Sequence, residues 1–130
     1  MVASVDSSVT VWVRRTDGWD SSYHAMVSKR GSNSEYNLYL TPTSGQAYCY
    51  IKASDGTTSN VSTSGTIADD TWVHLATTID DMTLKFYING SLDSTHTLTT
   101  GSKQSQTEPF GVGAISGSGS EGFQGYFDSF

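Results

Sequence analysis

The sequence predicts an all-β protein, a two-sheet antiparallel jelly-roll sandwich with almost no helix. Apolar residues recur at every second position in short runs, which is the spacing of strands with one buried face. Turn-forming residues separate these runs at intervals of about 8 to 12 residues, as in sandwiches and jelly rolls. The 130 residues include 21 Ser and 17 Thr, a composition that favours strands and turns, and no segment shows sustained helical periodicity.

The first half of the chain contains five predicted strands. In the first of them, residues 8–15, Val9, Val11 and Val13 share one face. Trp12 falls on the opposite face. The other four strands are expected at 24–30, 36–40, 47–53 and 60–63, separated by polar loops rich in Gly and Ser.

The segment 72–97 predicts two consecutive hairpins. Apolar residues of its first two strands alternate. Those expected in the core, together with Val9, Val11 and Val13, are Leu75, Ile79, Leu84, Phe86 and Ile88. The polar residues DDMT connect these two strands. Asn89 and Gly90 then predict a type I′ turn, because both residues tolerate positive φ. A third strand is expected at 91–97, and shorter ones near 109–114 and 123–130.

Charge and composition exclude several classes of partner. The chain has 7 Lys plus Arg against 13 Asp plus Glu, a net charge of -6, which opposes binding to phosphate backbones. No apolar run approaches the ~20 residues that span a bilayer, so no membrane insertion is expected, and the N-terminus does not resemble a signal peptide. Cys49 is the single cysteine and has no partner for an internal disulfide.

No pattern of catalytic residues emerges, so the sequence does not predict an enzyme. The glutamates are far apart in sequence, whereas glycoside hydrolysis needs two carboxyl groups facing one cleft. The histidines lack the spacing of zinc ligands, and His74 is expected to pack or hydrogen-bond within its strand. These residues are Glu35, Glu108, Glu121, His24, His74 and His96.

Five segments resemble, in order and spacing, the laminin-G-like, concanavalin A-like jelly-roll domains: SVTVWVRR, MVSKRG, YNLYL, DDTWVHLATTIDDMTLKFYING and GFQGYFDSF. The resemblance implies that Trp12 and Trp72 are framework residues of the core. It also implies an extracellular, cell-surface or virion-surface location. In such domains the Asn-Gly hairpin is scaffold, so any function is expected in the loops.

The same resemblance implies that residues 1–130 form a single domain of a longer protein. The family usually has a further strand before this chain begins and a longer final strand than GYFDSF, so an open sheet edge is expected there. Related jelly rolls often hold a structural calcium near the final strand. Asp128 is the acid at that position, which makes calcium the implied cofactor and Asp128 its implied ligand.

The loop TDGWDSSYH is the candidate ligand site. Trp19 lies off the alternating positions, with Asp17, Asp20 and Tyr23 close in sequence. An aromatic ring can stack on the apolar face of a sugar while polar neighbours form hydrogen bonds. Two alternatives stay open: Trp19 folds back over the sandwich edge as a lid, and the aspartates serve only as turn residues.

These features favour a non-catalytic carbohydrate-binding or adhesion module of a larger extracellular or surface protein, with a glycan or a surface protein as its partner. The alternative is a structural or assembly domain that binds protein partners, or copies of itself as a homo-oligomer, through the open sheet edge. A degenerate glycoside hydrolase ranks third. The sequence does not separate the first two.

Overall fold

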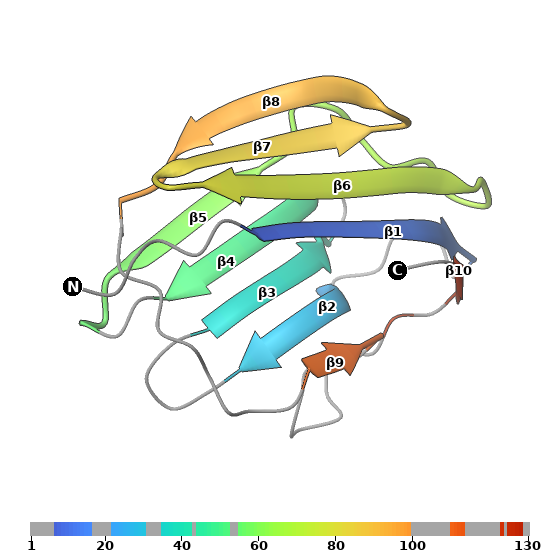
Figure 1. The fold of residues 1–130 in the computed structure, drawn as a ribbon. Helices are drawn as coiled ribbons and strands as arrows, with labels where there is room; N and C mark the ends of the chain where they lie inside the picture. The colour runs from blue at the N-terminus through green and yellow to red at the C-terminus, as the bar shows by residue number, and fades with distance from the viewer. Residues whose placement is uncertain are drawn as a thin grey trace.

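The computed structural model is a sandwich of two five-stranded antiparallel sheets, which confirms the predicted fold class (Figure 1). It describes residues 7–16, 22–30, 35–42, 44–52, 55–99, 110–113, 123 and 125–128. One sheet has the order β10-β1-β6-β7-β8 and the other the order β5-β4-β3-β2-β9. The strands are β1 (Ser7–Arg15), β2 (His24–Arg30), β3 (Glu35–Leu40), β4 (Ala47–Lys52), β5 (Thr58–Ser62), β6 (Val73–Asp80), β7 (Thr83–Ile88), β8 (Ser91–Thr97), β9 (Phe110–Val112) and β10 (Gly125–Asp128).

The strands lie where the alternating pattern predicts them, within a few residues at each end. Asn89 and Gly90 have φ angles of 51° and 82°, so the positive φ values that a type I′ turn requires are both present between β7 and β8. Within the described ranges, no helix has the length and apolar character needed to cross a bilayer.

The core fills the space between the two inner sheet faces. The residues predicted to form it are buried or pack against it, with Val9 and Ile88 at its margin. Its buried members are Val11, Val13, Met26, Val27, Leu38, Leu40, Ala47, Cys49, Ile51, Ile67, Val73, Leu75, Ile79, Leu84, Phe86 and Leu98. Both sheets contribute residues to this core, so each sheet needs the other to keep its apolar face away from water.

Trp12 and Trp72 were expected in the core, but both lie outside it, so this prediction is wrong. Their exposed fractions are 40% and 42%. Val11 and Val13 flank Trp12 and both point inward, so the alternation of strand side chains turns Trp12 to the outer face. Val73 is buried at the start of β6 and leaves Trp72 on the outer side in the same way.

Polar contacts join the sheets as well as apolar packing. The hydroxyl of Tyr36 on β3 lies 2.9 Å from that of Thr77 on β6, and burial raises the pKa of Tyr36 well above its usual range. The phenol therefore stays protonated and available for hydrogen bonding at neutral pH.

Asp93 closes one edge of the sandwich. The register of β7 and β8 shifts between Phe86 and Tyr87, which makes Asp93 the extra residue of a bulge. Its carboxylate accepts hydrogen bonds from the backbone N–H of Ser64 at 2.6 Å and of Gly65 at 2.8 Å. Burial is the largest single effect and acts to raise the pKa of Asp93, but these two bonds, the Ser94 side chain and the nearby His96 together outweigh it and hold the pKa below its ordinary value.

Leu75 is fully buried on β6, so Leu75→Ala removes core packing. We expect it to lower the free energy of unfolding by about 2 to 5 kcal/mol. Thr78→Ala, on the outer face of the same strand, should cost less than about 1 kcal/mol. Urea denaturation followed by tryptophan fluorescence measures both, and equal midpoints for the two variants would contradict this core.

Loss of the Asp93 carboxylate in Asp93→Asn is expected to cost about 1 kcal/mol at neutral pH, because the group is partly exposed and water replaces part of its bonding. The folded pKa lies below the unfolded value of about 3.9, so this contribution is present above the unfolded pKa. It is lost as the pH falls through the folded pKa.

The free energies of unfolding of wild type and Asp93→Asn should therefore converge as the pH falls through that acid range. Asp80→Asn, which changes an exposed aspartate at the end of β6, serves as the control and should follow wild type throughout. A difference between wild type and Asp93→Asn that grows as the pH falls would refute the stabilising role of the carboxylate.

Candidate functional site

Four tyrosines gather on the outer face of the β5-β4-β3-β2-β9 sheet. We call them the tyrosine cluster: Tyr23, Tyr39, Tyr48 and Tyr50. Tyr23 precedes β2, and its ring centroid lies 5.8 Å from that of Tyr39 and 5.9 Å from that of Tyr48. The rings of Tyr39 and Tyr48 are 6.3 Å apart. Aromatic rings at these separations and tilts attract one another.

Alternation and register explain this gathering. On β4, Ala47, Cys49 and Ile51 point into the core, which leaves Tyr48 and Tyr50 on the outer side. Tyr39 pairs with Tyr48 across the sheet.

Ala25 on β2 pairs with Tyr39 from the other side. Its small side chain leaves room above the sheet for the ring of Tyr23, which contacts Tyr39.

The cluster carries hydrogen-bonding groups as well as rings. The hydroxyl of Tyr48 donates to Oδ1 of Asn60 on β5 at 2.8 Å. Burial raises the pKa of Tyr48, and the neighbouring phenols of Tyr23 and Tyr50 add to the effect. The Tyr48 phenol is therefore protonated at neutral pH and can donate a hydrogen bond.

A buried polar pair lies on the same outer face. Ser28 on β2 and Asn37 on β3 are opposite one another, and the Ser28 hydroxyl donates to Oδ1 of Asn37 at 2.7 Å. Both residues are almost fully buried. Asn37 also pairs with Tyr50, so this polar pair adjoins the tyrosine cluster.

One of the four predicted loop residues is described, and it belongs to the cluster. Tyr23 is 42% exposed and in contact with two other rings. Asp17, Trp19 and Asp20 lie outside the described residues. Sequence reasoning missed Tyr39 and Tyr48, although the alternation of YNLYL and AYCYIK places a tyrosine on the non-core face of each strand.

Asp128 lies on the other sheet and does not join the cluster. It is exposed on β10 and pairs with Trp12 of β1. The described part of the chain contains no group of three or more His, Cys, Asp or Glu side chains that could hold a metal ion. Calcium at Asp128 therefore stays a prediction from the family.

The three histidines are separate and have structural contacts. His24 is buried with its Nε2 atom 3.3 Å from Nη2 of Arg15. The His74 ring packs at a tilt against Trp12, and Nε2 of His96 lies 2.8 Å from the carbonyl oxygen of Ser62. The packing of His74 agrees with its predicted role.

The glutamates cannot be placed in the same way. The side chain of Glu35 lies outside what the structure describes, as do Glu108 and Glu121.

Solved structures of low sequence identity share this fold. Domain 4 of AbnA, a GH43 extracellular arabinanase from Geobacillus stearothermophilus, in complex with arabinotriose, matches 98% of this chain with a TM-score of 0.74 and 22% identity. CBM40 of the Ruminococcus gnavus IT-sialidase matches 95% with a TM-score of 0.73 and 16% identity. Domains LG4-5 of the mouse laminin alpha1 chain match 91% with a TM-score of 0.65 and 13% identity.

This chain spans only part of the chains in those structures: 60% of the arabinanase domain 4 chain, 72% of the CBM40 chain and 30% of the laminin LG4-5 chain. No curated protein matches it in sequence. A family model does match, over residues 1–130, and its description is the concanavalin A-like lectin/glucanases superfamily. With the two-sheet sandwich and the whole chain covered by that model, this protein belongs to the concanavalin A-like lectin/glucanases superfamily.

Proposed function

We propose that this domain is a non-catalytic carbohydrate-binding module and that the tyrosine cluster contacts the glycan. The observation that carries the proposal is the ring of Tyr23, which is 42% exposed and held against Tyr39 and Tyr48. A sugar presents apolar C–H groups on its ring faces and hydroxyls at its rim. An exposed aromatic ring with nearby hydrogen-bonding groups complements both.

The side chains of the tyrosine cluster are also ordered before any ligand binds, which lowers the entropy cost of weak binding. Tyr39 and Tyr48 stand on paired strands, and Tyr48 is fixed further by its bond to Asn60. Side chains that are already ordered lose little rotamer freedom when a ligand arrives. A rigid tyrosine surface therefore supports binding with few contacts.

We propose that the loop before β2 extends this tyrosine surface. Asp17, Trp19 and Asp20 precede Tyr23 by three to six positions in the sequence. We place Trp19 as a second stacking ring and the two aspartates as acceptors for sugar hydroxyls. The similar arabinanase domain, solved in complex with arabinotriose, supports a saccharide as the class of ligand.

Glycan binding is expected to depend on Tyr23 and Trp19. Tyr23→Ala and Trp19→Ala should each weaken binding about fivefold to tenfold, because an aromatic contact contributes about 1 kcal/mol. Tyr87→Ala changes a half-buried tyrosine on the outer face of the other sheet and should leave affinity unchanged. Glycan arrays identify the saccharide, and calorimetric titration then compares the variants.

Circular dichroism and thermal melts must first show that each variant keeps the wild-type fold. The proposal fails if no polysaccharide or oligosaccharide binds wild type. It also fails if folded Tyr23→Ala and Trp19→Ala bind as tightly as Tyr87→Ala.

The second candidate function is assembly through a sheet edge. β10 is a short edge strand whose neighbour in the sheet order is β1, and edge strands can pair with another chain. If this edge binds a second copy, sedimentation velocity should give a sedimentation coefficient that rises with protein concentration. Replacement of Phe127 by Pro would block such pairing, whereas a constant monomer value would remove the homo-oligomer from this alternative.

A further inference from the structure

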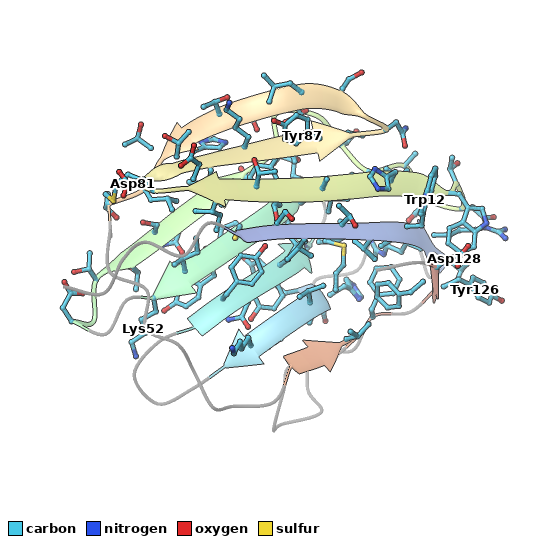
Figure 2. All side chains as sticks on the ribbon, in the orientation of Figure 1. Trp12, Lys52, Asp81, Tyr87, Tyr126 and Asp128 are labelled. Atoms are coloured by element: carbon cyan, nitrogen blue, oxygen red, sulfur yellow. The ribbon has the colours of Figure 1, made fainter. Side chains whose placement is uncertain are left out.

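A second group of aromatic side chains lies on the outer face of the β10-β1-β6-β7-β8 sheet. We call it the tryptophan patch: Trp12, Arg14, Trp72, His74, Tyr126 and Asp128. Figure 2 shows Trp12, Tyr126 and Asp128 together at the end of the sandwich where β10 pairs with β1, opposite the end that carries Lys52 and Asp81.

The strand register arranges the patch in two rows. Asp128, Trp12 and His74 lie side by side across β10, β1 and β6. Tyr126 and Arg14 form the next row, two residues further along β1. Strand geometry separates the rows by about 7 Å and makes the first row about 10 Å wide. Each row thus places an aromatic ring beside a group that forms hydrogen bonds.

The aromatic side chains of the patch are unusually exposed. Trp12 is 40% exposed, Trp72 is 42% exposed and Tyr126 is 58% exposed. Single exposed apolar residues are normal on a protein surface. Three large exposed rings at one end of one sheet face are more than isolated apolar residues, and such a gathering is a candidate binding surface.

Contacts within the patch hold these rings in place. The centroids of Trp12 and His74 are 5.1 Å apart, and those of Trp72 and Tyr126 are 6.5 Å apart. The guanidinium carbon of Arg14 lies 5.9 Å from the centre of the Tyr126 ring. Little side-chain freedom remains to be lost on binding.

The placement of β10 depends on Gly125. Its φ is 152°, and a Cβ atom there would collide with the backbone carbonyl oxygen of Arg14. A glycine therefore lets β10 approach β1 closely enough to bring Tyr126 beside Arg14. The patch is assembled by this approach.

Charge narrows the class of ligand. Nη2 of Arg14 is 2.6 Å from Oδ1 of Asp70, so its positive charge is already matched. Asp128 adds an exposed carboxylate, and the whole chain has a net charge of -6. An anionic saccharide would meet repulsion on this surface, whereas a neutral one would meet acceptors for its hydroxyls.

Size favours a saccharide over a folded protein. A stable protein interface uses about 20 to 30 residues on each side. The two rows of the patch span only a few side chains, and each row combines an aromatic ring with a hydrogen-bonding group. That combination suits a ligand whose own surface alternates apolar faces and hydroxyls.

We infer that the tryptophan patch is a second saccharide site, specific for a neutral oligosaccharide that stacks on Trp12 and Trp72 and hydrogen-bonds to His74 and Asp128. It lies on the opposite sheet from the tyrosine cluster and does not depend on it. A domain with ligand sites on both outer faces can bridge two glycan chains or bind one extended surface with increased avidity.

The test uses the full chain carrying Tyr23→Ala, which weakens the tyrosine cluster, so that any further loss caused by a change in the tryptophan patch can be measured against this background. Neutral arabino-, xylo- and gluco-oligosaccharides and anionic oligogalacturonates are titrated by calorimetry. A neutral oligosaccharide should bind, and adding Trp72→Ala should weaken it about tenfold. Adding Leu92→Ala, a 56% exposed residue on β8 of the same sheet, should change nothing.

Trp12→Ala gives an independent second variant with the same expected loss, and circular dichroism confirms that each variant is folded. The inference is overturned if the Tyr23→Ala protein binds none of these saccharides, or if it prefers the oligogalacturonates. Undiminished binding in both tryptophan variants overturns it too. So does a dimer in sedimentation that Trp72→Ala dissociates, because the patch would then be an interface between copies.

The two proposals fail separately. Complete loss of binding in Tyr23→Ala alone rejects the second site and leaves the tyrosine cluster intact as a proposal. Binding that is lost only in Trp12→Ala and Trp72→Ala supports the tryptophan patch as a saccharide site and rejects the tyrosine cluster.

Discussion

Burial of one face of each five-stranded sheet against the other is the constraint on which the remaining structure depends. Strand side chains alternate, so each inward Val, Leu or Ile forces its neighbours outward. Val11 and Val13 thus place Trp12 on the surface, and Cys49 places Tyr48 and Tyr50 there. The inner positions form the apolar core, so the aromatic residues between them in sequence lie on the outer faces.

Two local departures from regular pairing redirect side chains in the sandwich, one in the edge strand β8 and one in β2. The bulge in β8 turns the carboxylate of Asp93 toward the backbone of Ser64 and Gly65. A second irregularity in β2, between Ala25 and Val27, puts Met26 in the core without displacing either neighbour from its face. Such bulges change the direction of a side chain without changing the order of strands.

The family supplies a scaffold, and the function is carried by what stands on its surfaces. Most residues of both aromatic surfaces stand on strands, and each surface adds one residue that precedes a strand: Tyr23 before β2 and Trp72 before β6. Among the described contacts, Tyr48 of the tyrosine cluster hydrogen-bonds to the neutral Asn60, whereas Arg14 of the tryptophan patch forms an ion pair with Asp70. Such differences in polar groups are the basis on which the two proposed saccharide sites would differ in specificity.

The sequence by itself determined the strands, the Asn89–Gly90 turn and the aliphatic core, because alternation and turn chemistry are local properties of the chain. It also singled out Tyr23. Only the tertiary structure decided which outward residues meet, since Tyr23, Tyr39 and Tyr48 are brought together by strand pairing between distant segments. Alternation already put Trp12 on the face opposite Val11 and Val13, but only the packing of the two sheets decided that the valine face is the inner one and the tryptophan face the outer one.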